Sequence, residues 1–162
     1  MSIQHQLYQE LDRLRNLGPL TDVPQRLVID TRSGQLQCDL SVVESLGCAF
    51  QRLSLVTSQL ESATIEELKS IGETLSQKLN YLMEPICPIE IDEEGCIVQL
   101  RSNPPQKNEN GHCYYELLVR RDELSLCRFQ KTPASIRQPV EAHVTKEVLL
   151  RLADDLISVI PC

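Results

Sequence analysis

The chain lacks a hydrophobic segment long enough to cross a membrane. Its longest apolar runs, such as residues 117–119, are far shorter than the roughly 20 residues of a membrane-spanning helix. Six Gly and nine Pro in 162 residues are too few for a fibrous or low-complexity chain. The first residues form neither a basic nor an apolar stretch, so we expect no signal peptide. With 41% hydrophobic and 24% charged residues, the composition is typical of a globular protein. We therefore expect a soluble protein in the cytoplasm, without a membrane partner.

Positive charge is scarce as well. The 16 Lys and Arg residues face 23 Asp and Glu residues, which gives a net charge of −7 and a pI near 5.0. Proteins that bind phosphate backbones need dense positive charge, and no block of like charge occurs in the sequence. We therefore expect no nucleic-acid partner for this acidic protein.

The cysteines have no pattern that indicates disulfides or zinc. Their number is odd, and no C-x-x-C motif occurs, so the usual disulfide frameworks and zinc signatures are absent. Most of them lie among apolar residues, where a free thiol behaves as a small hydrophobic group. We expect reduced thiols at all seven positions, which are Cys38, Cys48, Cys87, Cys96, Cys113, Cys127 and Cys162.

Motifs of catalysis and cofactor binding are missing. The sequence has no G-x-G-x-x-G, P-loop, G-x-S-x-G or H-E-x-x-H motif. Its histidines, His5, His112 and His143, fall in three separate predicted elements. The adjacent pair His112 and Cys113 would point to opposite faces of a strand, so one site would seldom use both. We predict no catalytic residue, no metal site and no cofactor.

Three segments have the apolar period of amphipathic helices, at 3–17, 64–82 and 144–160. In the second segment, Thr64 and Glu67 form a capping-box pattern that marks the start of the helix. Pro85 and Pro88 follow its end. The acidic pair Asp154 and Asp155 falls off the apolar stripe of the last helix and is predicted to face solvent.

Seven segments alternate apolar and polar residues with the period of two that is typical of antiparallel strands. They are 27–29, 36–40, 48–57, 89–91, 96–101, 114–121 and 124–131. The predicted turns lie at 31–34, at 92–95 and at Asp122–Glu123, and the segment 41–47 is either a short helical turn or an irregular crossing. We expect Ile89, Ile91 and Cys96 to point inward, with exposed loops at 103–111 and 132–139. The order is α-βββ-α-ββββ-α, which predicts an α+β fold with a largely antiparallel sheet and flanking helices.

The length fits a single domain spanning 1–162, and the sequence also suggests two half-repeats, 22–84 and 85–162. The helix pattern that begins at Thr64 recurs 81 residues later at Thr145, and the triplet 53–55 recurs at 124–126. The alternative is that any two capped amphipathic helices share these features. Both interpretations remain open at this point.

The strands 114–121 and 124–131 provide the candidate binding site. One face of this hairpin is apolar and is predicted to join the core: Tyr115, Leu117, Val119, Leu124 and Leu126. The other face mixes aromatic, apolar and charged residues, which is the composition of a protein interface. Its candidate interface residues are Tyr114, Leu118, Arg120, Cys127 and Phe129. Alternatively, the first or last helix, or the loop 103–111, covers this face.

The order of elements, the small size and the acidic pI resemble the type III secretion chaperone fold, although the second half here has four strands. That resemblance implies a sheet that binds extended protein segments and that dimerises, without catalysis. We therefore predict a non-enzymatic protein-binding or adaptor protein of chaperone-like type, with a protein partner or self-association. The alternative is a small-ligand binding protein or an enzyme with a pocket between sheet and helices.

Overall fold

The computed structural model describes residues 2–18 and 23–161. Three α-helices occur in these residues: α1 (Ile3–Asn16), α2 (Ile65–Lys78) and α3 (Lys146–Ser158), and a 3-10 turn, η1 (Asn80–Leu82), follows α2. The strands are β1 (Gln25–Thr31), β2 (Gly34–Val43), β3 (Gly47–Val56), β4 (Ile86–Asp92), β5 (Ile97–Ser102), β6 (Gln106–Asn108), β7 (Gly111–Val119), β8 (Glu123–Lys131), β9 (Gln138–Val140) and β10 (Ala142–Thr145). This is the expected α+β order, extended by three short strands.

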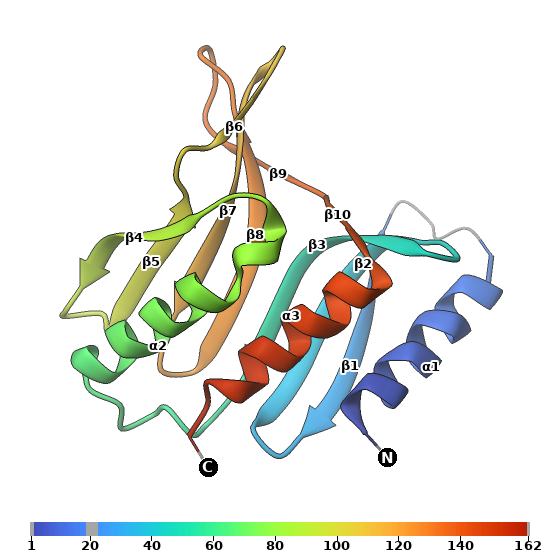
Figure 1. The fold of residues 1–162 in the computed structure, drawn as a ribbon, viewed down its shortest axis with the longest axis horizontal. Helices are drawn as coiled ribbons and strands as arrows, with labels where there is room; N and C mark the ends of the chain where they lie inside the picture. The colour runs from blue at the N-terminus through green and yellow to red at the C-terminus, as the bar shows by residue number, and fades with distance from the viewer. Residues whose placement is uncertain (1, 19–22, 162) are drawn as a thin grey trace.

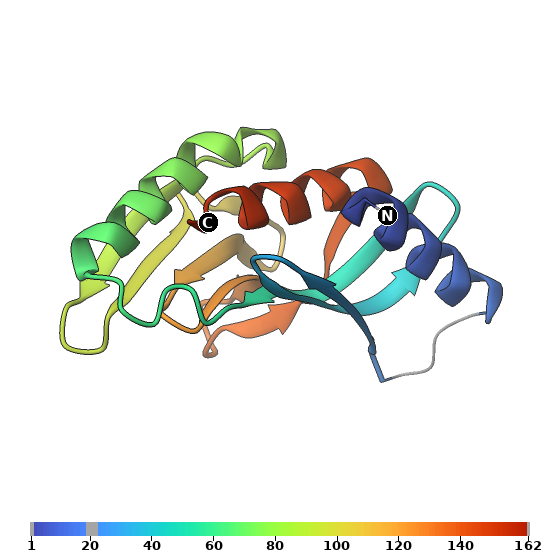
Figure 2. The same ribbon diagram turned by 90° about the horizontal axis from the view of Figure 1, so that it is seen from below.

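All strands belong to one antiparallel sheet with the main order β1-β2-β3-β8-β7-β5-β4. The three helices lie on the same side of this sheet (Figure 2). Helix α1 contacts β1 and β2, α3 contacts β3 and β10, and α2 contacts β4, β5 and β7 (Figure 1). We call the opposite side the helix-free face. In the described residues, no helix is long and apolar enough to cross a membrane.

The core fills the space between the sheet and the helices. Each helix contributes one apolar stripe, as its period predicts, and the buried stripe of α2 includes Leu68 and Leu75. Thr64 caps this helix, because its hydroxyl accepts a hydrogen bond from the Glu67 N–H. The strands contribute every second residue, such as Leu53 and Leu55 of β3, both fully buried. The helices therefore cover only one face of the sheet.

The β7–β8 hairpin differs from the prediction in register. Val119 pairs with Leu124, and the Arg120 N–H donates to the Glu123 carbonyl, so the turn is Arg121–Asp122 and not Asp122–Glu123. The predicted register was displaced by two residues. Because side chains alternate with a period of two, such a displacement leaves every residue on its predicted face. The predicted core side of this hairpin is therefore confirmed.

Three short strands were not predicted. Strand β6 lies in the predicted loop 103–111 and pairs with β7, and β9 lies in the predicted loop 132–139 and pairs with β8. Val144 belongs to β10, where it pairs with Cys48, so the last helix begins two residues later than predicted. Strand β2 continues to Val43 and β3 begins at Gly47, so the segment 41–47 is not helical. It is the end of a strand, with an irregular register between Leu40 and Val42, followed by a hairpin turn. Segments of three or four residues are too short to show a periodic pattern.

The strand pair β4–β5 also corrects the prediction. Ile89 and Ile91 are exposed, because β4 is an edge strand with a register shift between Pro88 and Glu90. Cys96 is half-buried and lies in the turn before β5, with a left-handed backbone (φ 53°). A residue in a left-handed conformation interrupts the regular alternation of a strand. Cys96 nevertheless packs against the core as expected, next to the buried Val98 and Leu100 of β5, so the inward prediction is wrong only for Ile89 and Ile91.

The repeated triplets of the sequence meet in the sheet. Leu53 pairs with Leu126 and Leu55 with Leu124, on either side of the pair Ser54–Ser125. Two identical triplets in antiparallel register are related by a local twofold axis. Each of the later helices also covers strands of the other half. The division into half-repeats stays a prediction, because this arrangement shows proximity and not common origin.

Candidate functional site

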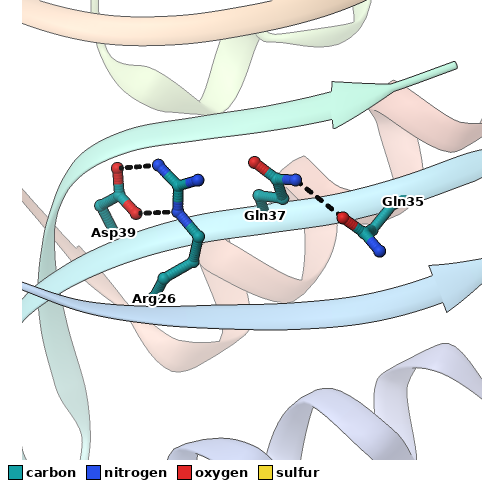
Figure 3. A network of polar contacts seen from close by, with 4 residues as sticks. All are labelled: Arg26, Gln35, Gln37 and Asp39. Atoms are coloured by element: carbon teal, nitrogen blue, oxygen red, sulfur yellow. Dashed lines mark hydrogen bonds and ion pairs between the residues drawn. The ribbon is translucent and has the colours of Figure 1, made fainter.

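The helix-free face carries a row of charged side chains across the sheet. Arg26 and Asp39 are cross-strand partners, and the Arg26 guanidinium donates two hydrogen bonds to the Asp39 carboxylate, at 2.8 and 3.2 Å (Figure 3). On the same strand as Asp39, the Gln37 amide donates to Gln35 at 2.7 Å. Antiparallel sheets commonly have one such solvated face. On β1 and β2 this face is therefore mainly polar and internally paired, with Val28 as an exposed apolar residue.

The row continues through β3, β8, β7 and β5, as Arg52, Cys127, Glu116 and Arg101. Arg52 forms an ion pair with Glu123. Glu116 is buried, accepts a hydrogen bond from Gln99 at 2.8 Å and forms an ion pair with Arg137. Arg101 ends the row without an ion pair to any described residue. The row thus leaves one exposed guanidinium unpaired at its far end.

The five predicted interface residues lie on or beside this face, because each falls at an alternate position of β7 and β8. Tyr114 and Phe129 are cross-strand partners, with ring centroids 6.1 Å apart. Leu118 lies opposite Ser125, and Cys127 lies opposite Glu116. Arg120 directly follows β7, and its Nε is buried without a hydrogen-bond partner among the described residues. The hairpin brings Tyr114 and Phe129 together and leaves the other three apart from them.

Neither the first nor the last helix covers the aromatic pair. The Arg137 guanidinium lies 3.9 Å from the centre of the Phe129 ring, and the Arg101 guanidinium lies 5.4 Å from that of Tyr114. Both distances allow cation–π attraction. Tyr114 is 8% exposed as a result. The cover over the aromatic pair is therefore made of cations, which the sequence analysis did not predict.

A cavity of about 480 Å³ opens beside this aromatic pair on the helix-free face. We call it the basic pocket. It is lined by Arg101, Pro105, His112, Tyr114, Lys131, Ile136 and Arg137. No carboxylate is among these residues. In a chain with a net charge of −7, this local excess of positive charge points to an anionic ligand.

Strand register explains how the basic residues come together. His112 pairs with Lys107 of β6 on one side and with Lys131 of β8 on the other. Cross-strand partners lie about 5 Å apart, so the three side chains form a basic row across the upper strands. The Lys131 ammonium also donates to the Thr132 carbonyl at 2.8 Å. This row could not be predicted from the sequence, because its members are separated by up to 24 positions.

A second cavity, of about 530 Å³, lies at the end of α2 on the helix side of the sheet. There Glu84 and Arg128 form an ion pair at 3.0 Å, with side chains 12% and 11% exposed. The Arg128 guanidinium lies 4.5 Å from the centre of the Tyr115 ring, and burial raises the pKa of Tyr115. Glu84 Oε1 and Arg128 Nη1 are buried without a hydrogen-bond partner among the described residues. The hydrogen-bonding capacity of these two atoms is therefore unsatisfied in this cavity.

Acidic and thiol groups outside these cavities have structural contacts. The Asp155 carboxylate accepts a hydrogen bond from the Tyr81 hydroxyl at 2.7 Å, and Asp154 accepts one from Gln4, so this pair does not simply face solvent as predicted. Burial is the main cause that raises the pKa of Tyr81. The six described cysteines are free thiols, and Cys162 lies outside the described residues. In residues 2–18 and 23–161, no group of three His, Cys, Asp or Glu side chains is placed to hold a metal ion.

No known family model, curated protein or solved structure matches this chain. The likeness to type III secretion chaperones therefore depends on the order of elements alone.

Proposed function

We propose that this chain is a non-catalytic protein-binding protein that takes an acidic segment of a partner at the basic pocket. The observation that carries the proposal is that Arg101, His112 and Lys131 line one pocket beside Tyr114, with Lys107 as the next residue of the basic row. Complementary charge steers a partner toward such a patch and fixes its register. The rest of this acidic surface would repel the same partner.

The shape of the site favours an extended segment. The basic pocket opens on the helix-free face, where the side chains of cross-strand partners lie side by side. Ile136 at its margin is 82% exposed, and together with Pro105 it offers apolar contact to residues that flank a bound charge. A chaperone-like role, in which the bound segment is kept extended, is the form of this proposal that the order of elements favours. We place this role in the cytoplasm, on the cysteine pattern of the sequence.

The test is binding of a fluorescently labelled peptide of alternating Glu and Ser, measured by anisotropy, beside the same peptide with Gln for Glu. We expect only the Glu peptide to bind, with an affinity that falls as salt is added. Arg101→Ala should weaken binding about fivefold to tenfold, since it removes an unpaired cation. Arg26→Ala is the matched control, because Arg26 lies on the same face but is already paired with Asp39.

Two results would contradict the proposal. One is equal binding of the Glu and Gln peptides. The other is an Arg101→Ala variant that is folded and binds the Glu peptide as tightly as the original chain. A loss of binding in Arg26→Ala of the same size would place the site elsewhere on the face.

A second candidate function, binding of a small polar molecule, is favoured by the unsatisfied Glu84 Oε1 and Arg128 Nη1. A group that both donates and accepts hydrogen bonds, such as an amide, would complement these two atoms. Saturation-transfer NMR with acetamide and glutamine tests this candidate. The signal should disappear in Glu84→Gln, and absence of any signal in the original chain would remove the candidate.

A further inference from the structure

The charges around the basic pocket do not balance within the protein. Arg137 is neutralised by Glu116, whereas Arg101, Lys107 and Lys131 form no ion pair with any residue in 2–18 or 23–161. Glu109, in the turn between β6 and β7, is the acid next to this row in the chain, and it too forms no ion pair there. Arg101 and Lys131 therefore leave two uncompensated positive charges in the lining of the pocket, and Lys107 lies one strand beyond it. A single carboxylate ligand would neutralise only one of them.

Hydrogen-bond donors are also left over at the site. The Arg101 guanidinium has five N–H groups, and none of them has a hydrogen-bond acceptor among the described residues. The Lys131 ammonium uses two of its three N–H groups on the carbonyls of Thr132 and Ser135. These donors come from β5 and β8, on either side of the Tyr114 ring. They surround the cavity instead of following a single strand.

We infer that the group recognised at the basic pocket is a phosphoryl group on a serine or threonine of the partner segment, an inference that rests on the proposed function. A phosphoryl group carries a charge of about −1.5 to −2 at pH 7 and has three strong acceptor oxygens. It matches both the excess charge and the excess donors, whereas a carboxylate supplies only one negative charge and two acceptor oxygens. Arginine in particular binds phosphate through two parallel hydrogen bonds.

The source of the phosphoryl group is a polypeptide, because the surroundings of the pocket suit one. Exposed Ile136 and half-buried Pro105 stand beside the cations, so residues on either side of the phosphorylated one find apolar contacts. A nucleic acid would carry further phosphates along the face, where Asp39, Glu123 and Glu116 already neutralise the arginines. The helix-free face thus favours one localised dianion over a polyanion.

The experiment compares three peptides that differ only at one central residue, phosphoserine, glutamate or serine, titrated into the isotopically labelled chain and followed by NMR. We expect the phosphoserine peptide to bind at least tenfold more tightly than the glutamate peptide, with shifts confined to residues 101–116 and 128–137. Arg101→Ala should remove this preference, and Arg101→Lys, which keeps the charge but loses the planar fork, should retain only part of it. Arg26→Ala should leave the preference unchanged.

Inorganic phosphate and a short single-stranded oligonucleotide serve as competitors. Phosphate should displace the peptide only at much higher concentration, because it lacks the flanking contacts. If phosphate competes on equal terms, the ligand is a free anion, and if the oligonucleotide binds more tightly, the ligand is a nucleic acid; either result overturns the inference. Equal affinity for the phosphoserine and glutamate peptides also overturns it and leaves the proposed function standing. If neither peptide binds, both fail.

Discussion

The guanidinium of Arg137 stacks on Phe129, at 3.9 Å from its ring centre, while it forms an ion pair with the carboxylate of Glu116. The two contacts fasten the segment between β8 and β9 across the helix-free face. Glu116 is the only acidic side chain on β7, and it is 5% exposed. The position of one arginine therefore decides both how a buried carboxylate is neutralised and how the aromatic pair is covered.

Replacing Arg137 should leave the buried carboxylate of Glu116 without its ion-pair partner. In Arg137→Ala the carboxylate keeps only its hydrogen bond from Gln99, so we expect the free energy of unfolding to fall by about 1–2 kcal/mol. The value is moderate because the Arg137 side chain is 42% exposed and solvent screens its charge. Urea denaturation measures the change. The control is Arg13→Ala, which breaks an exposed pair with Glu10 and should cost clearly less than Arg137→Ala, because solvent screens the pair. Equal costs for the two variants would contradict the prediction.

The buried pair Glu84–Arg128 should behave differently from the exposed pairs. Removing one partner leaves a desolvated charge, so Arg128→Met should cost about 3–5 kcal/mol of unfolding free energy. The double variant Glu84→Leu with Arg128→Met removes both charges and should be more stable than Arg128→Met alone. A double-mutant cycle measured by urea denaturation gives the coupling, and the Arg26–Asp39 pair provides the exposed reference. A coupling no larger than in that reference would mean that the pair is solvated.

The sequence predicted the faces of the strands better than the site on them. Leu117 and Val119 lie on the core side in any register that is displaced by an even number of residues. The two-residue error in the hairpin register therefore did not change their predicted face. His112 and Lys131 instead meet only in the observed register of the β7–β8 hairpin. Lys107 joins them only because β6 exists, and a three-residue strand leaves no periodic signal. Their grouping depends on hydrogen bonds between strands, which the composition of a segment does not encode.

Strand pairing predicts some neighbours of Tyr114 and Phe129 but not others. Parity predicts the two rings on one face of the hairpin, and the observed register makes them cross-strand partners. Arg101 and Arg137, which cover them, come from β5 and from the segment before β9. Nothing in the hairpin sequence indicates those neighbours. Whether this face binds a partner stays a prediction.

Two glycines at the start of strands should tolerate no side chain. Gly34 and Gly111 have φ values of 148° and 147°, and a Cβ at either position would lie 2.2 Å from a carbonyl oxygen of the neighbouring strand. Gly111→Ala should therefore destabilise the protein by more than about 2 kcal/mol, because backbone must move. Gly18→Ala is the control, with φ 92° but no atom within 4 Å; it should cost only the backbone strain, about 1 kcal/mol. Thermal unfolding should show a larger loss of stability in Gly111→Ala than in Gly18→Ala. The opposite order would contradict the predicted clash of the Cβ with the carbonyl oxygen.

Helix capping offers a direct comparison between α2 and α3. The hydroxyls of Thr64 and Thr145 each accept a hydrogen bond from an N–H three residues later, at 3.2 and 3.1 Å. Thr64→Ala and Thr145→Ala should each lower the free energy of unfolding by about 1 kcal/mol. Thr74→Ala removes a hydroxyl from the middle of α2 and should be nearly neutral or slightly stabilising. Urea denaturation of all three distinguishes capping from a general effect of losing threonine, which would make the three costs equal.

Alkaline pH should weaken the fold through its buried thiols. Burial raises the pKa of Cys48 from 9.0 to about 11, although nearby Lys146 acts in the opposite direction. The unfolded thiol then releases its proton first, so the contribution of Cys48 is complete below pH 9 and is lost as the pH rises to about 11. The loss is on the order of 2 kcal/mol.

Urea denaturation at pH 8.5 and 10.5, with reductant present, measures this loss. Because burial also raises the pKa of Cys38, Tyr81 and Tyr115, the decisive quantity is the difference between variants and not the total slope. Cys48→Ala should reduce the decline between the two pH values. An identical decline in Cys48→Ala and the original chain would show that this thiol ionises as readily in the folded as in the unfolded protein.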